Sequence, residues 1–105
     1  MVTMDKCRLK LFVNDHTPRT QMAIDSLKQI LETELAGRYE LEIIDVHENP
    51  QEAETHKILA TPTVIREVPS PVRRVIGDLS DRHQVLLGLD LTPLNQVHAG
   101  TSDNG

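Results

Sequence analysis

Residues 57–91 read KILATPTVIREVPSPVRRVIGDLSDRHQVLLGLDL and contain two short apolar runs on either side of a proline-rich turn. The runs at 64–68 and 72–76 are rich in the β-branched residues Val and Ile, which is typical of β-strands. The turn between them, Pro69-Ser70-Pro71, is short, whereas parallel strands need a much longer connection. The segment therefore predicts an antiparallel hairpin, with Thr61-Pro62 leading into its first strand.

A helix is expected after the hairpin, over residues 81–90, with Asp78 or Ser80 as its N-cap. Gly88 falls inside this helix, where glycine costs about 0.5–1 kcal/mol relative to alanine. The apolar run at 85–91 is also short enough to form a strand. Local preference is therefore weak in this run, and tertiary packing has to decide between helix and strand.

The first half of the chain predicts two strands that alternate with two helices. Residues 8–13 alternate and then become fully apolar, as a central strand does, and Thr17 followed by proline marks a helix start. Residues 39–46 form the second strand candidate, and Asn49 is expected to cap a short helix over 50–59. The whole order is thus β-α-β-α-β-β-α, an α/β fold whose first two strands lie parallel.

The composition fits one small domain. The 105 residues include 11 basic and 16 acidic side chains, and the formal net charge of −5 argues against nucleic-acid binding, which needs a basic surface. No apolar run is long enough to span a membrane, and the N-terminus lacks the apolar core of a signal peptide. We therefore expect a cytoplasmic protein without a membrane partner, with a single domain over residues 1–91 and a flexible C-terminal tail over 92–105.

The predicted order is the layout of a thioredoxin-like domain, in which a redox cysteine pair follows the first strand. Here that position reads NDHTP at 14–18, and the single cysteine, Cys7, precedes the strand. Thiol exchange needs an accessible thiolate and ordinarily a second thiol, so redox catalysis is not expected. The sequence contains no phosphate-binding, dinucleotide-binding or hydrolase motif, and its five histidines lack metal-site spacing. The chain is therefore predicted to have no catalytic residue, no cofactor and no metal.

Charge is unevenly distributed along the chain. Residues 38–56 carry six carboxylates against one basic side chain, Arg38, a pattern typical of a solvated face. Arg73 and Arg74 follow on the predicted hairpin. They either form ion pairs inside the domain with acidic residues such as Asp78, where surface pairs contribute little, or engage an acidic partner. The sequence leaves both interpretations open.

Several motifs resemble those of the KaiB family of cyanobacterial circadian clock proteins. The most specific lie in the second half of the chain: KILATPT at 57–63, PVRR at 71–74, IGDLS at 76–80 and LGLDL at 87–91. The resemblance covers about residues 8–91, and the N-terminal sensor domain of the kinase SasA is a related domain. It implies a non-enzymatic regulator that binds KaiC, a hexameric ATPase and autokinase, and modulates its phosphorylation or activity.

The resemblance also implies a metamorphic protein. KaiB-like chains adopt either a ground-state order, β-α-β-β-α-α-β, which self-associates as a tetramer, or the thioredoxin-like order, which binds partners. The order predicted above is the second, and we expect it to dominate here, with Pro62 preceded by a cis peptide bond. The positions assigned to the fold-switching region are Pro62, Pro69, Pro71, Gly77, Asp78, Gly88 and Asp90.

The sequence departs from the usual KaiB pattern at positions that matter for assembly. Cys7 and Pro93 stand where tyrosines help self-association in the family, so we expect mainly a monomer rather than a homo-tetramer. The second strand contains Glu40 and Glu42 where the usual sequence is Ala-Leu-Lys-Val, which inverts the charge of the edge that pairs with KaiA. KaiA binding is therefore not expected to transfer, and the chain resembles a divergent paralogue.

The expected partner surface comprises the first helix and the segment at 57–62, with Lys57 at its edge. The residues assigned to partner binding are Lys57, Arg73, Arg74, Glu40 and Glu42. Binding of a KaiC-like ATPase is the leading hypothesis. The alternatives are a thioredoxin-like redox protein, which the single cysteine disfavours, and a stand-alone sensor or adaptor module similar to the SasA domain.

Overall fold

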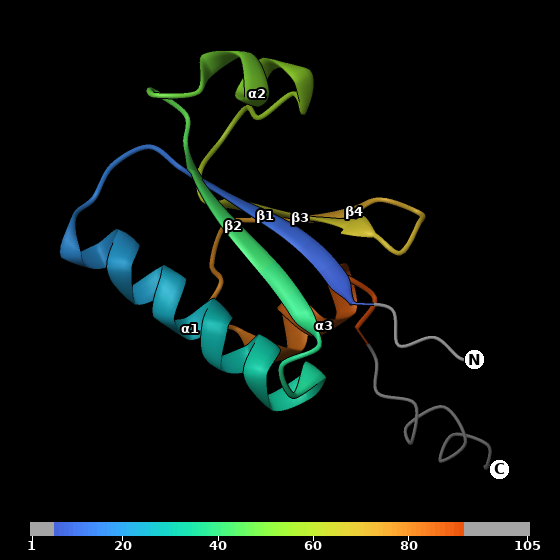
Figure 1. Ribbon diagram of the computed structural model, residues 1–105. Coiled ribbons are helices and arrows are strands. Elements are labelled where there is room, and N and C mark those ends of the chain that lie inside the picture. Colours follow the sequence, from blue (N-terminus) through green and yellow to red (C-terminus); the bar gives the residue numbers. More distant parts are fainter. Residues whose placement is uncertain (1–5, 92–105) are drawn as a thin grey trace, which may run out of the picture.

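The computed structural model describes residues 6–91, which contain four strands and three helices (Figure 1). In chain order they are β1 (Cys7–Val13), α1 (Pro18–Leu35), β2 (Tyr39–Asp45), α2 (Pro50–Thr55), β3 (Thr63–Val68), β4 (Arg73–Ile76) and α3 (Arg82–Gly88). This is the predicted thioredoxin-like order. The expected tail over 92–105 lies outside the described residues. No helix within 6–91 is both long enough and apolar enough to cross a membrane.

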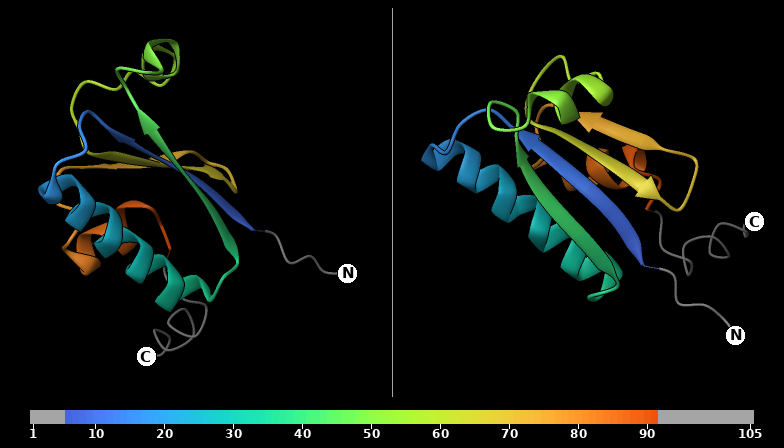
Figure 2. Two further views of the ribbon diagram at one scale, coloured as in Figure 1. Left: turned by 60° about the vertical axis from the view of Figure 1, so that its left-hand side comes forward. Right: turned by 45° about the horizontal axis from the view of Figure 1, so that its top comes forward.

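The strands form one mixed sheet in the order β2-β1-β3-β4. β1 and β2 are parallel, as predicted for strands connected through a helix, and β3 runs antiparallel to both β1 and β4. α1 and α3 lie on one face of this sheet and α2 lies on the other (Figures 1 and 2). We call the first side the helical face and the second the α2 face.

The alternation of side chains along β1 divides the core into two parts. Leu11 and Val13 point to the helical face, where they join the buried side chains of α1 and α3. Phe12 points to the α2 face and packs with Ile44 and Ile65. α2 itself contributes no buried residue. The helical face therefore holds most of the apolar core, and the α2 face holds only a small cluster.

The predicted hairpin is confirmed. β3 and β4 pair antiparallel, with Val64 opposite Val75. The peptide bond before Pro62 is cis, as expected, and the bonds before Pro69 and Pro71 are cis as well. The three prolines assigned to the fold-switching region thus lie just before β3 and in the turn between the two hairpin strands.

The ambiguous run at 85–91 forms the end of a helix and a turn. α3 ends at Gly88, and Leu89 is fully buried. A Cβ atom on Gly88 would clash with Cγ2 of Val75, so the glycine allows α3 to approach β4 closely. Asp90, with a φ of 57°, then turns the chain away from the helix axis. Tertiary packing therefore decides in favour of the helix.

The helix caps differ in part from the sequence predictions. Thr17 caps α1 as predicted. The N-cap of α3 is Asp81, whose carboxylate accepts the N–H of Gln84. Neither Asp78 nor Ser80 caps this helix, because Asp78 instead accepts the N–H and the hydroxyl of Ser80 inside the preceding turn.

α2 is shorter than predicted. It ends at Thr55 rather than near residue 59, and Asn49 makes no side-chain cap to it. The helix stops because Lys57 takes a left-handed conformation with a φ of 54°, and the N–H of Ile58 then bonds back to the carbonyl of Ala53. Glycine is the usual residue in this conformation. Contacts from elsewhere in the fold must therefore hold this end of α2.

Arg66 is a buried cation on the helical face, and the residue is 5% exposed. Its guanidinium donates to the carbonyl of Pro71, in the hairpin turn, at 2.8 Å and to the carbonyl of Asp90, after α3, at 3.5 Å. Within residues 6–91 it has no carboxylate partner. Arg66 therefore bridges the hairpin turn and the end of α3 through backbone acceptors.

We expect Arg66→Ala to lower the free energy of unfolding by about 1 to 3 kcal/mol, because two hydrogen bonds from a charged donor and the packing of its aliphatic stem are lost. Urea unfolding followed by circular dichroism measures this value. The matched control is Arg73→Ala, since Arg73 is the exposed residue opposite Arg66 in the hairpin and should change the free energy by at most about 0.5 kcal/mol. Equal losses in the two variants would show that the bridge contributes nothing specific.

Candidate partner-binding surface

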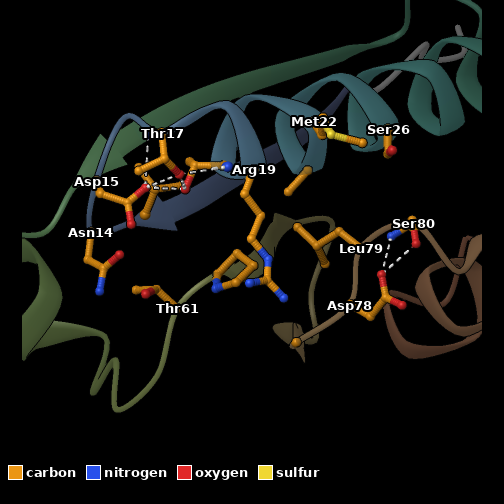
Figure 3. A pocket seen from close by; sticks show the side chains of 15 residues that line it. Asn14, Asp15, Thr17, Arg19, Met22, Ser26, Thr61, Asp78, Leu79 and Ser80 are labelled. Carbon is orange, nitrogen blue, oxygen red and sulfur yellow. Dashed lines mark hydrogen bonds between the residues drawn. The ribbon is translucent and has the colours of Figure 1, made fainter.

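An open cleft of about 560 Å³ lies where three segments meet (Figure 3). Its walls are the start of α1 with the residues that lead into it, the Thr61-Pro62 turn before β3, and the loop at 77–80. The first residues of β3 lie beside the end of β1, which places this turn next to α1. Gly77 has a φ of 107°, which favours glycine, and its N–H bonds to the carbonyl of Pro62. Backbone contacts thus join two of the three walls.

Asp15 fixes the entrance to α1. Its carboxylate accepts hydrogen bonds from the hydroxyl of Thr20 and from the N–H and hydroxyl of Thr17. These bonds, that from Thr20 foremost, lower the pKa of Asp15 below its usual value. Asp15 is therefore ionised at neutral pH, and its acceptor capacity is used by the turn.

Arg19 is the cation of the cleft, and sequence reasoning did not single it out. It lies in the first turn of α1, and its side chain extends between Thr61 and Asp78 (Figure 3). The hydroxyl and the N–H of Ser80 lower the pKa of the Asp78 carboxyl. Arg19 forms no ion pair with any other residue of the described range. The cleft therefore presents a free guanidinium and an ionised carboxylate to solvent.

No cysteine lines the cleft. Cys7 begins β1, at the opposite end of that strand, where it is half-buried and packs against the core of the helical face. Burial raises the pKa of its thiol, and the charge of Arg66 offsets this shift only in part. The reactive thiolate is therefore disfavoured at Cys7, and the cleft lacks the group that thiol exchange requires.

Only the end of the 57–62 segment reaches the cleft. Thr61-Pro62 lines it, whereas Lys57 is exposed at the end of α2. Leu59 is 94% exposed, and Met22, which lines the cleft from α1, is 69% exposed. Sequence reasoning predicted this segment and helix as the partner surface but missed both apolar side chains, because composition alone does not distinguish an exposed leucine from a core one.

Arg73 and Arg74 do not form a common patch. Neighbouring residues of a strand point to opposite faces, and Arg74 lies on the α2 face. There its guanidinium donates to the carbonyls of His56 at 2.8 Å and Lys57 at 3.3 Å. The predicted ion pair between Arg74 and acidic residues such as Asp78 is therefore wrong, because Arg74 instead bonds to carbonyls at the end of α2. Both arginines are exposed, and their contact with an acidic partner stays a prediction.

Glu40 and Glu42 lie on β2, which is an edge strand, and neither lines the cleft. Glu40 forms exposed ion pairs with Arg8 at 3.5 Å and Lys6 at 3.8 Å. Glu42 is exposed and stands opposite Lys10 in the strand register. The structure therefore separates these two glutamates from the cleft and places them on the charged edge of the sheet.

One group of side chains has the donor atoms of a metal site. His16, Asp45 and Glu48 each place one donor atom within 4.8 Å of the others. Asp45 already accepts the N–H groups of His47 and Glu48 and lies 2.7 Å from Nε2 of His16. The bond from His47 is the main cause that lowers the pKa of Asp45. These contacts form a turn after β2. That the chain binds no metal stays a prediction.

Comparison with known proteins adds independent findings. The KaiB domain family model matches residues 10–91. The circadian clock oscillator protein KaiB of Parasynechococcus marenigrum is 59% identical over 83 residues, which are 79% of this chain and 80% of that protein. The protein of the same name from Prochlorococcus marinus is 55% identical over 91 residues, which are 87% of this chain and 85% of the relative.

Among solved structures, the N-terminal domain of Synechococcus elongatus SasA is similar, with a TM-score of 0.70 and 26% sequence identity. The match covers 88% of this chain and 90% of that domain. It confirms the predicted thioredoxin-like fold and the predicted relation to the SasA domain. Because the family model spans most of the described residues and the relatives share more than half of the aligned positions, the chain belongs to the KaiB family.

Proposed function

We propose that this chain is a non-enzymatic regulatory protein of the circadian clock type. It binds a KaiC-like hexameric ATPase and autokinase and modulates its phosphorylation or activity. Membership of the KaiB family supports this proposal, since the relatives compared above are circadian clock oscillator proteins. The proposal places the protein in the cytoplasm, with a protein rather than a nucleic acid or a membrane as its partner.

Family membership carries the proposal, and the exposure of Leu59 marks a candidate contact with the partner. Complete burial of a leucine side chain is worth about 1.5–3 kcal/mol, and at 94% exposure almost none of this is realised in the free chain. Leu59 lies between the cation Lys57 and the Thr61-Pro62 wall of the cleft, where Met22 is exposed as well. We therefore propose Leu59 and Met22 as apolar contacts for the protein partner.

Different observations bear on two other candidate functions. Thiol chemistry is unsupported, because the cleft is lined by no cysteine and burial raises the pKa of the Cys7 thiol. A stand-alone sensor or adaptor module is favoured by the similarity to the SasA domain. One assay distinguishes the regulator from the adaptor module. A change in the phosphorylation of the ATPase without any added kinase supports the regulator.

The proposal does not include KaiA binding or assembly into a homo-tetramer. A strand added to the edge of β2 would meet the carboxylates of Glu40 and Glu42, in line with the charge inversion noted above. Cys7, at the start of β1, packs against the core and offers no aromatic anchor to a second copy. We therefore propose a mainly monomeric, divergent member of the family.

Native mass spectrometry with a KaiC homologue from the same genome tests the proposal. We expect a complex at protein concentrations of about 10 μM, and a free chain that is mainly monomeric. Incubation of the ATPase with the chain should also change its phosphorylation state over time. The proposed partner would be wrong if no KaiC-like homologue of that genome formed a complex.

Lys57→Glu should weaken this complex through electrostatics, by about tenfold at low salt and by less as salt is added, because exposed charges are screened over about 10 Å at 0.1 M. Titration calorimetry at two salt concentrations measures the effect. Arg38→Glu is the matched control, since Arg38 is an exposed cation beyond the far end of α1 and should leave the affinity unchanged. A loss of affinity that is the same at every salt concentration would contradict a role for the Lys57 charge.

Leu59→Ser should weaken the complex by about tenfold or more while the free energy of unfolding stays within about 0.5 kcal/mol, because an exposed side chain contributes to binding and not to the core. Leu87→Ser is the control: Leu87 lies on α3, is 62% exposed, and does not line the cleft. Binding and urea unfolding are measured on both variants. Equal affinities for the two variants would remove Leu59 from the interface.

A further inference from the structure

β4 is an outer strand of the sheet with an unpaired side (Figures 1 and 2). Within residues 6–91 it pairs only with β3. Gly77 follows β4 and lies opposite Pro62, and its N–H bonds to the Pro62 carbonyl. Because hydrogen-bonded and non-bonded pairs alternate along an antiparallel ladder, the backbone groups of Arg74 and Ile76 point away from β3. The free edge therefore offers the N–H and the carbonyl of both residues to another strand.

The α2 face of this edge is apolar. Ile76 shares that face with Arg74 and is 55% exposed, and Val72, just before the strand, is 58% exposed. The guanidinium of Arg74 is turned toward α2, where it bonds to the carbonyls of His56 and Lys57. Short edge strands ordinarily carry charged side chains that discourage further pairing. Here the charge on this face is engaged elsewhere, and the apolar side chains stay exposed.

The other face of the edge carries a free cation. Arg73 points to the helical face, opposite Arg66 in the register, and is exposed. It forms no ion pair with a carboxylate of the described residues. β4 itself contains no acidic residue. A carboxylate on an incoming strand would therefore meet a positive charge on this face.

The two outer strands of the sheet carry opposite charges. β2 contains Glu40 and Glu42, whereas β4 contains Arg73 and Arg74. Opposite charges across neighbouring strands are favourable, and like charges directly opposite are destabilising. An acidic segment is therefore repelled from β2 and attracted to β4. The same rule disfavours pairing of β4 with β4 of a second copy, because the arginines of both strands would come together.

We propose that the free edge of β4 binds an extended segment of a partner protein in which acidic and apolar residues alternate. The backbone of this segment bonds to Arg74 and Ile76, its carboxylates lie beside Arg73, and its apolar side chains cover Ile76. Alternation is required because successive side chains of a strand point to opposite faces. β4 lines no part of the cleft, so this surface is distinct from the one proposed for the KaiC-like ATPase.

NMR spectroscopy of the full chain with two synthetic peptides tests this site. In the first short peptide Glu and Val alternate, and in the second Lys replaces each Glu. We expect the Glu peptide to bind with a Kd of about 1 mM or below and to slow the amide exchange of Arg74 and Ile76 by about tenfold, because their N–H groups gain acceptors. The Lys peptide should not bind.

Two variants distinguish the charge from the backbone groups. Arg73→Glu should weaken binding of the Glu peptide by about fivefold or more and allow the Lys peptide to bind. Arg38→Glu makes the same change in net charge beyond the far end of α1 and should leave both affinities unchanged. Ile76→Pro removes an outward N–H and no bond to β3, so it should abolish binding while the hairpin stays paired. Arg73→Glu, at an exposed position, suffices if the proline variant does not fold.

Equal binding of the two peptides, binding that survives in a folded Ile76→Pro variant, or slowed exchange on β2 instead of β4 would overturn the proposal. Slower exchange of Arg74 and Ile76 as the chain alone is concentrated would assign the edge to a second copy, and would also overturn it. No ATPase is present in these measurements, so their outcome is independent of the proposed function.

Discussion

The pairing of β3 with β1 is the contact on which the rest of the described structure depends. β3 is buried on both faces, because Val64 joins the cluster under α1 and α3 while Ile65 packs with Phe12 on the α2 face. Since β3 runs antiparallel to β1, its first residues lie beside the end of β1, and the Thr61-Pro62 turn comes to the start of α1. The cleft is a consequence of that direction. The return of α3 to the helical face also follows from the direction of β3, because β4 runs back along β3.

Most of the fold could be predicted because its signals are local. Alternating apolar residues and prolines indicate the hairpin, and Thr17 before a proline indicates the start of α1. The roles of Arg66 and Arg74 could not be predicted, because their acceptors are backbone carbonyls, which every residue has and which no residue type marks. The candidate site could also be predicted only in part. Its segments were recognised by resemblance, whereas Arg19 and Leu59 stand out only once packing shows which side chains remain outside the core.

The two short helices depend on the arginines of the hairpin. α2 has six residues and α3 has seven, well below the roughly 12 to 15 at which an isolated helix is stable in water. Each is followed by a left-handed residue other than glycine, Lys57 after α2 and Asp90 after α3. The carbonyl of each of these residues accepts a hydrogen bond from a guanidinium, that of Arg74 or that of Arg66. A cation is favourable at the negative end of a helix. The hairpin thus organises one helix on each face of the sheet.

The two faces are held by different forces, and this difference bears on function. On the helical face, α1 and α3 share a continuous apolar cluster, so moving either helix exposes core side chains to water. On the α2 face, the helix has no buried residue and is held by Lys10, His56 and Arg74 through polar contacts. Polar contacts at partly exposed sites contribute little each, so α2 can open at a lower free energy than α1. The segment at 57–62 follows directly from α2. The exposed leucine therefore lies in a segment that continues from the element held mainly by polar contacts, and a movement of α2 would leave the apolar core of the helical face undisturbed.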